Sequence, residues 1–262
     1  VIETDKFLGV VNNDTCLVSI MHVNNEIGSV QPIKEIGKIK AKGRYDFIFH
    51  VDGVQSYLKL PVDVKNLNID LFTISGHKIH SMKGIGALYA RKGLKVVPIW
   101  QGGGQEKGLR PGTENVPGIA AMGKAIEVIL SGKYGTYENV RENRDRFIMM
   151  VKERVPGAYL NSPATINSSP HIASIAFAGV KAEVLLHILE KDGVYVSTGS
   201  ACSSRAKGES HVLKSIGLER DIISGTIRFS FSLQNSFDET VYVVDVLKNA
   251  LEYYRNSTGR TK

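Results

Sequence analysis

Short apolar runs that alternate with polar and helix-like segments most strongly restrict the fold of residues 1–90. The runs typical of buried strands lie at residues 16–22, 47–51, 69–74 and 85–90. Between the first two runs, Pro32 suits a first helical position. Ile33, Ile36 and Ile39 then recur on one helical face. Strands that alternate with helices and short loops predict an α/β sheet with polar residues at the strand ends.

The second half of the chain has a different pattern. A glycine-rich stretch, residues 101–115, has too few apolar residues to fold by itself. We expect helices near residues 115–131, 136–154, 181–191, 209–216 and 238–255, and strands at residues 171–177 and 226–231. This α+β arrangement predicts a domain boundary, which divides the chain into residues 1–133 and 134–262.

Composition excludes several classes of protein. Of the 262 residues 42% are hydrophobic, and no run approaches the ~18 apolar residues of a transmembrane helix. The N-terminus shows no export signal and two cysteines cannot form a disulfide framework, so we expect a cytoplasmic protein without a membrane. The net charge of +7 is spread along the chain, which argues against direct nucleic-acid binding.

The two cysteines have contrasting surroundings. Cys202 lies in residues 196–204, a stretch of small and hydroxylic residues with little to pack. Cys16 lies in the apolar residues 15–20 and is of the kind usually buried for structure. A thiol on a segment that cannot build a core is either incidental or present for its reactivity, and residues 196–204 alone leave both interpretations open.

A lysine follows the third predicted strand. Lys78 comes after Ser75, Gly76 and His77. A lysine at a strand end, shielded and near other cations, can attack a carbonyl to form a Schiff base. Ser75 and His77 provide side-chain donors and Gly76 allows close approach of the backbone, a combination that suits a phosphate. The alternative is an ordinary solvated surface lysine.

Further polar side chains follow the neighbouring strands. Asp52 ends the second predicted strand, and a carboxylate there can hold a pyridinium nitrogen protonated, which makes a pyridine cofactor an electron sink. Asp52 could equally be a helix cap or turn residue. Gln55 and Asn25 could donate to a phenolate oxygen of the same ring, although both also suit ordinary turns. The order of these strand-end signals favours a cofactor site.

These segments together resemble a known family. The chain is similar to group I cysteine desulfurases, the NifS/IscS-like branch of the class V aminotransferases, which are pyridoxal-phosphate enzymes of fold type I. The matching segments are residues 21–28, 50–52, 75–78, 83–89, 110–115, 198–203 and 227–230. The resemblance implies the C-terminal part of a large mixed-sheet α/β domain, followed by a smaller α+β domain that carries the cysteine loop, about residues 196–209.

The resemblance assigns a cofactor site. Lys78 would bind pyridoxal 5'-phosphate covalently and Asp52 would pair with its ring nitrogen. Asn25 and Gln55 would contact the ring oxygen. The phosphate would be bound by the turn from Ser75 through Gly76 to His77. Thr113, on the glycine-rich loop, would reach the phosphate in a neighbouring subunit, which implies a homodimer.

The resemblance also assigns a reaction. Arg228 would bind the carboxylate of L-cysteine, together with Asn25. Lys78 would move protons at the substrate carbons, and Cys202 would take the sulfur as a persulfide, leaving alanine. An iron–sulfur scaffold or a tRNA-thiolation enzyme would accept the sulfur. No permanent metal site is expected, although Cys202 could briefly ligate a nascent cluster on a partner.

The family is longer at its N-terminus than this chain. The resemblance implies that the additional part carries a phosphate-binding turn and a histidine that stacks on the cofactor ring. A separate N-terminal chain, a shortened protein or a proteolysed product could each explain this start, and without the additional part we expect cofactor binding to be weak or absent. The histidines listed next are expected in core or surface roles instead: His22, His50, His80, His171 and His187.

Two alternatives remain open at this stage. One is a selenocysteine lyase or another pyridoxal-phosphate carbon–sulfur lyase, although residues 198–202 favour the desulfurase. The other is a non-catalytic half of a split desulfurase, which would dimerise and dock a sulfur acceptor.

Overall fold

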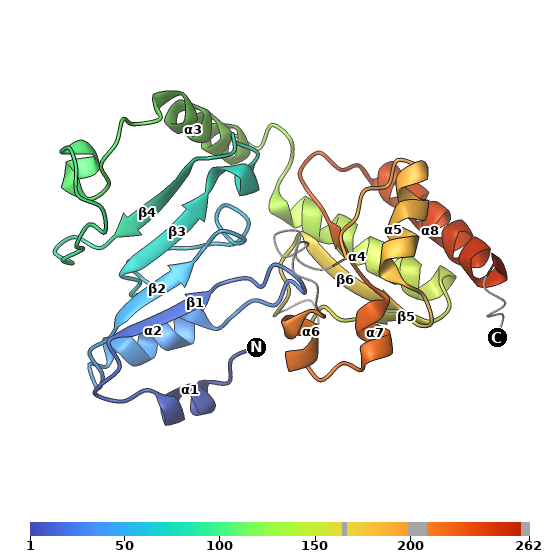
Figure 1. Ribbon diagram of the computed structural model, residues 1–262, viewed down its shortest axis with the longest axis horizontal. Helices are drawn as coiled ribbons and strands as arrows, with labels where there is room; N and C mark the ends of the chain where they lie inside the picture. Colours follow the sequence, from blue (N-terminus) through green and yellow to red (C-terminus); the bar gives the residue numbers. More distant parts are fainter. Residues whose placement is uncertain (164–166, 199–208, 258–262) are drawn as a thin grey trace. The chain divides into compact units, whose positions relative to one another are not determined.

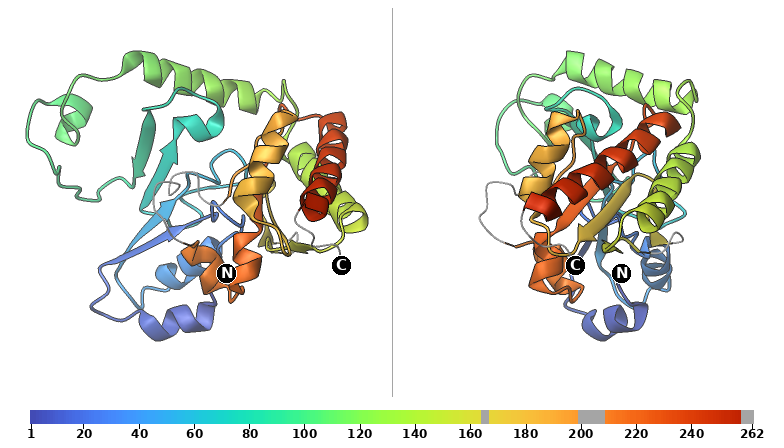
Figure 2. Two further views of the ribbon diagram at one scale, coloured as in Figure 1. Left: turned by 45° about the vertical axis from the view of Figure 1, so that its right-hand side comes forward. Right: turned by 90° about the vertical axis from the view of Figure 1, so that its right-hand side faces the viewer.

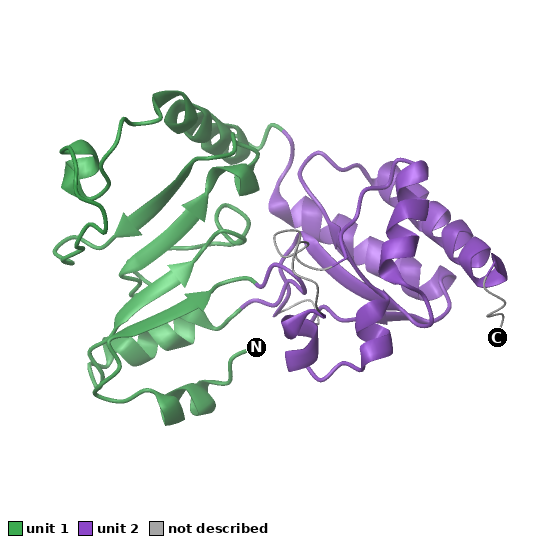
Figure 3. Cartoon of the chain, viewed as in Figure 1, with its two compact units in different colours: residues 1–23, 31–133 green, residues 24–30, 134–262 purple. Residues whose placement is uncertain are grey.

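A computed structural model describes residues 1–163, 167–198 and 209–257, which form two compact units (Figure 3). The first unit comprises Val1–Val23 and Gln31–Lys133, and the second comprises Asn24–Val30 with Tyr134–Lys262. The second unit therefore includes a short segment that is preceded and followed in the sequence by residues of the first unit. None of the helices in these described ranges has the length and apolar character needed to cross a membrane.

A four-stranded mixed sheet forms the centre of the first unit (Figure 1). Its strands are β1 (Leu17–Met21), β2 (Ile48–Asp52), β3 (Leu71–Ser75) and β4 (Gly86–Ala90), in that spatial order. The first three strands are parallel and β4 is antiparallel to β3. The predicted α/β mixed sheet is confirmed. Because β1, β2 and β3 are parallel, their carboxyl ends share one edge of the sheet.

The helices of the first unit are α1 (Thr4–Val10), α2 (Ile33–Ala41) and α3 (Val116–Leu130), with the 3₁₀ turns η1 (Gly76–Ile79) and η2 (Gln105–Gly108). Ile33 and Ile36 of α2 are buried, as the spacing of the isoleucines predicts. They join a core that includes Phe47, Phe49 and Val51. Each such buried side chain contributes about 1.5–3 kcal/mol through loss of water contact.

A buried carboxylate organises the amino end of β3. Asp70, which directly precedes β3, is 1% exposed and accepts a hydrogen bond from the Phe49 amide at 2.8 Å. The Arg91 guanidinium pairs with Asp70 at 2.6 Å, and Lys40 of α2 pairs with it as well. The carboxylate thus holds β2, α2 and the chain after β4 at this end of the sheet, with its charge compensated.

The second unit is built around a three-stranded antiparallel sheet. Its strands are β5 (Ala158–Leu160), β6 (Ile172–Phe177) and β7 (Thr226–Ser230). Its helices are α4 (Tyr137–Arg154), α5 (Ala182–Lys191), α6 (His211–Ser215), α7 (Arg220–Ser224) and α8 (Phe237–Ser257). Helix α8 contacts both α4 and α5 and lies between them (Figure 2). Every residue of β6 is buried, as expected for the central strand of a covered sheet.

The sequence predicts a buried strand at residues 16–22 that contains a structural cysteine. The strand is confirmed, but the prediction that it is buried is wrong. The strand exists as β1, but β1 lies at the edge of the sheet and exposes Leu17 and Met21. Cys16 precedes the strand and is exposed, with its thiol 3.5 Å from the Asp14 carbonyl oxygen. In the order of this sheet β1 has a neighbouring strand on one side only, so its apolar side chains are less covered than those of β2 and β3.

Candidate functional site

Two predicted site residues terminate adjacent parallel strands. Asp52 is the last residue of β2, and Ser75 is the last residue of β3. Asp52 pairs with Thr73 in the sheet register, and the Gly53 amide donates to the Thr73 carbonyl at 2.9 Å. The carboxyl ends of these strands therefore bring their following turns to one sheet edge, the usual place for ligands in open α/β sheets.

The turn after β2 holds Asp52 in a defined orientation. One Asp52 oxygen accepts the Val54 amide at 2.9 Å. In the described part of the chain nothing donates to the other carboxylate oxygen, which leaves an acceptor for a ring nitrogen. Gly53 is required here because a Cβ would lie 2.0 Å from the Phe72 ring. The same turn carries Gln55, which is half-buried.

The turn after β3 presents the predicted lysine. The Gly76 amide donates to the Ile85 carbonyl at 2.9 Å, and a Cβ at Gly76 would lie 2.6 Å from Ile85 Cγ2. Ser75 Oγ and His77 Nδ1 are 2.8 Å apart. Lys78 is half-buried, and its Nζ has no hydrogen-bond or ion-pair partner within the described ranges. The strand end and its turn thus carry a lysine amine, a hydroxyl and an imidazole within four consecutive residues.

This turn is surrounded by positive charge. Partial burial and the charges of Lys78, Lys83 and Lys59 lower the pKa of His77. Burial and Lys59 lower the pKa of His80 as well. Each imidazole is thereby held toward its neutral form, and the lysine cluster favours an anion such as a phosphate.

The second unit brings Asn25 and Arg228 together. Arg228 lies on β7, and its Nη1 donates to the Asn25 backbone carbonyl at 2.8 Å. The Arg228 amide donates to the Ser197 carbonyl at 2.7 Å, and the Ser197 amide donates back to Arg228 at 3.2 Å. The chain that leads towards Cys202 is therefore paired with the strand that carries Arg228.

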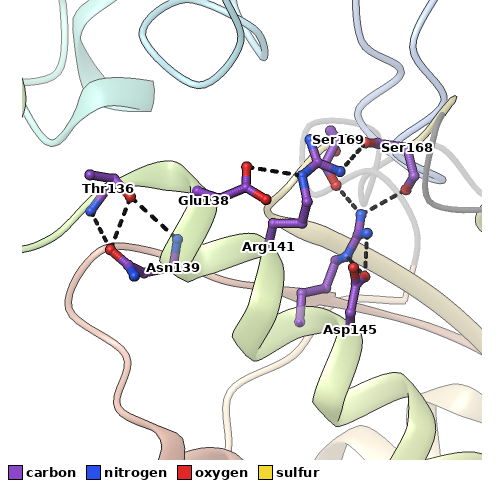
Figure 4. A network of polar contacts seen from close by, with 8 residues as sticks. Thr136, Glu138, Asn139, Arg141, Asp145, Ser168 and Ser169 are labelled. Atoms are coloured by element: carbon purple, nitrogen blue, oxygen red, sulfur yellow. Dashed lines mark hydrogen bonds and ion pairs between the residues drawn. The ribbon is translucent and has the colours of Figure 1, made fainter.

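A network of polar contacts on α4 reaches Ser168 and Ser169 (Figure 4). Arg144 is 1% exposed; its Nη1 donates to Ser168 Oγ at 2.7 Å and to the Ser169 carbonyl. Arg141 Nη1 donates to the Ser168 carbonyl at 3.0 Å. The Ser169 amide in turn donates to the Gly28 carbonyl at 2.8 Å. Helix α4 thus supports residues 24–30 through a short intervening loop.

Residues 24–30 also contact the chain that follows residues 199–208 in the sequence. Ser210 Oγ donates to Glu26 Oε2 at 2.5 Å and also accepts the Leu213 amide at 3.1 Å, which caps α6. Ile27 packs in a small apolar cluster with Leu213 and Ile223. Residues 24–30 are therefore tied to the described chain on both sides of residues 199–208.

Sequence reasoning missed Arg144, although a signal was present. The buried residues of α4 are Tyr137, Val140, Arg144, Phe147 and Val151. Their spacing of three and four residues places the arginine on the apolar face of the helix. An arginine at such a position needs partners, so the spacing predicts a buried polar contact.

The remaining predicted residues are distributed as follows. Thr113 is exposed on the loop between η2 and α3, where it lines a depression with Gly86 and Ala87 of β4. Cys202 lies outside the described residues. The structure thus groups Asp52, Gln55 and the 75–78 turn in the first unit, and Asn25 with Arg228 in the second.

The groups in the first unit suit pyridoxal phosphate. Among the described residues, one Asp52 carboxylate oxygen is left without a donor and matches a protonated ring nitrogen, and the Lys78 amine, equally without a partner there, matches an aldehyde. The Ser75 hydroxyl, the His77 imidazole and the surrounding lysines match a phosphate. The donor set therefore fits this cofactor.

Comparisons with known proteins show which chains this one resembles. The family model described as aminotransferase class-V matches residues 1–243. The cysteine desulfurase IscS of Dictyoglomus turgidum is 44% identical over 254 residues, covering 97% of this chain and 64% of that protein. The IscS of Methanosarcina thermophila is 40% identical over 260 residues, covering 99% of this chain and 63% of that protein.

A solved structure of a NifS-like protein superposes with a TM-score of 0.85 at 32% identity, over 96% of this chain and 65% of that one. This chain therefore spans less than two thirds of the length of these relatives. From the family match, the identities and the mixed α/β sheet, the chain belongs to the class-V aminotransferases, a family of pyridoxal-phosphate enzymes of fold type I.

Proposed function

We propose that the protein is a cysteine desulfurase that converts L-cysteine to L-alanine. The observation that carries this proposal is the available Lys78 amine on the tight turn after β3, beside the turn that carries Asp52. The name of the relatives from Dictyoglomus turgidum and Methanosarcina thermophila supports the same activity. Residues 196–204, rich in small and hydroxylic side chains, supply the thiol.

Each residue has a distinct part in the proposed reaction. Bound pyridoxal phosphate would serve as an electron sink for the substrate carbons. Asp52 holds a proton at the ring nitrogen, the turn from Ser75 to His77 binds phosphate, and Gln55 contacts the ring oxygen. Lys78 binds the cofactor and moves protons at the substrate carbons.

The substrate and sulfur are handled by other residues. Arg228 binds the substrate carboxylate, and Asn25 lies beside it. The Cys202 thiolate attacks the substrate sulfur: an S–S bond forms, the C–S bond breaks, and its electron pair stays with the carbon, which takes up a proton. The products are alanine and a Cys202 persulfide, so no external oxidant or reductant is needed.

The wider setting belongs to the same proposal. Thr113 would complete the phosphate site of a second copy in a homodimer. The persulfide sulfur would pass to an acceptor protein of iron–sulfur assembly or tRNA thiolation, in the cytoplasm. An additional N-terminal segment, present in the longer relatives, would complete the cofactor pocket.

Two cysteine variants test the thiol. Cys202→Ala should lower sulfide release from L-cysteine at least about 100-fold, because no nucleophile remains for the sulfur. Cys16→Ala is the matched control, since Cys16 is exposed and outside the site, and it should retain activity. Full activity in Cys202→Ala would overturn the persulfide role and favour another carbon–sulfur lyase.

The lysine is tested by absorbance on the 262-residue chain with added pyridoxal phosphate. At saturating pyridoxal phosphate, which offsets the weak binding expected of this chain, we expect a visible band that borohydride abolishes and that is absent in Lys78→Ala, because Lys78 presents its amine at this turn. Lys92→Ala, an exposed lysine, serves as the control. A wild-type chain that stays colourless would favour a non-catalytic half of a split assembly.

A further inference from the structure

Lys59 is a buried lysine to which the proposed reaction assigns no task. It is 8% exposed and lies at the end of the turn that begins after β2. Its Nζ donates a hydrogen bond of 2.9 Å to the backbone carbonyl of Lys78. Lys59 therefore contacts the residue that presents the reactive amine, through its backbone rather than its side chain.

The turn that carries Lys59 is well ordered by its own hydrogen bonds. The amides of Ser56 and Tyr57 both donate to the Gly53 carbonyl, and the Lys59 amide donates to the Ser56 carbonyl at 2.9 Å. Leu58 adopts a left-handed conformation with φ of 62°, which turns the chain sharply just before Lys59. This turn begins at Asp52 and so connects the carboxylate directly to Lys59.

The contact satisfies a group that the η1 turn cannot satisfy. The last carbonyls of a helical turn have no partner within it, and Lys78 lies in the final part of Gly76–Ile79. His80, which follows η1, is left-handed with φ of 62°, so the chain does not continue as a helix. The Lys59 ammonium thus acts as a side-chain cap on the turn that carries Lys78.

Burial makes this contact costly to maintain. Burial and the neighbouring Lys78 charge lower the pKa of Lys59 to about 8. No carboxylate pairs with Lys59 anywhere in the ranges that the structure describes. A methionine of similar length would fill the space without burying an amine, so the hydrogen bond to Lys78 is what a lysine adds at this position.

We propose that Lys59 is a positioning residue for Lys78, and that it couples the turn after β2 to the turn after β3 by holding the Lys78 carbonyl. The backbone part of this role follows from the contacts alone. Its consequence for the cofactor rests on the proposed function, because it concerns where the Lys78 amine is presented.

Amide hydrogen exchange on the 262-residue chain tests the coupling. The amides of His80 and Ser81 both donate to the Gly76 carbonyl and therefore report on η1. In Lys59→Met we expect both amides to exchange at least about tenfold faster, as loss of one charge-assisted hydrogen bond predicts. Lys59→Arg, which keeps a charged donor, should restore most of the protection, and exposed Lys65→Met should have no effect.

The sheet amides separate positioning from general stability. Val51 and Phe72, in the paired centres of β2 and β3, should keep wild-type exchange in Lys59→Met. Equal acceleration at Val51, Phe72 and Ser81 would show that Lys59 only stabilises the unit, and unchanged exchange at Ser81 would show no coupling; either result overturns the proposal. If Lys59→Met does not fold, Lys59→Gln is compared with Lys59→Arg at the same amides.

A labelling experiment tests the consequence for Lys78. Pyridoxal phosphate is added, trapped with borohydride, and located by peptide mass spectrometry. We expect the initial rate of labelling at Lys78 to fall about tenfold in Lys59→Met and to recover in Lys59→Arg. If wild-type Lys78 is not labelled while the exchange result holds, a non-catalytic half is favoured over the proposed function and the backbone role of Lys59 is still supported.

Discussion

His22 shows how a buried ionisable side chain responds to its surroundings. It follows β1, is 5% exposed, and its Nδ1 has no hydrogen-bond partner in the described part of the chain. Burial lowers the pKa of His22 from 6.5 to about 4. The sequence predicts a core or surface role for this histidine without choosing between them, because nothing local shows which strand lies at the sheet edge and which residues are covered.

The His22 pKa predicts a loss of stability in mild acid. The native state keeps His22 neutral down to about pH 4, whereas the unfolded chain binds a proton below about pH 6.5. The stabilising contribution is therefore full above pH 6.5 and falls by about 1.4 kcal/mol per pH unit towards pH 4. Urea unfolding of wild type and His22→Leu between pH 7 and pH 4 measures it; parallel pH profiles would contradict the assignment.

Individual site residues differ in how well the sequence predicts them. Asp52 and Ser75 end strands in the sequence pattern, and the structure places both at strand ends. Lys59 gives no such signal, because its role depends on a carbonyl of another turn. Asn25 contacts Arg228 through its backbone, a contact that no side-chain pattern reports.

At the scale of elements, length and periodicity decide what could be predicted. The long helices α3, α4 and α8 and the buried strand β6 lie within a few residues of their predicted bounds. Helix α1, strand β5 and helix α7 were not predicted. Helix α1 has one buried residue, Phe7, and strand β5 has three residues in all, so neither repeats a pattern long enough to recognise.

Helix α4 offers a comparison between two of its arginines. Arg144→Met should lower the free energy of unfolding by about 3 kcal/mol, because the Ser168 and Ser169 groups lose a buried charged donor. Arg154→Met, which removes a partly exposed pair with Asp245, should cost less than about 1 kcal/mol. Chemical denaturation measures both, and equal costs would show that the network of Figure 4 contributes little.

At the scale of the whole molecule, the order of the chain differs from the order of its units. Residues 24–30 belong to the second unit although residues 31–133 return to the first. The predicted division at residue 134 does not include this exchange of a segment. The place of residues 24–30 in the second unit arises from contacts of Gly28 and Glu26 with residues far along the chain. Such long-range contacts leave no local pattern in the sequence.

A fragment of residues 134–262 tests this arrangement. Alone it lacks the chain that pairs with Ser168, Ser169 and Ser210, so we expect a low thermal midpoint. A synthetic peptide of residues 22–32 should raise that midpoint by binding the folded fragment. A peptide with Gly28→Ala should not, because Gly28 has φ of +71° and a Cβ would lie 2.9 Å from Ser169 Oγ. Identical effects of the two peptides would contradict the assignment of this segment.

Asp70 stabilises one end of the first unit's sheet, while the predicted site residues lie at the other end. Its contacts with Phe49, Lys40 and Arg91 lie at the amino end of β3, away from the carboxyl ends that carry Asp52 and Ser75. Substitutions at the carboxyl ends leave this anchor untouched. Descendants of such a sheet can therefore acquire new ligands at one end while inheriting their stability from the other.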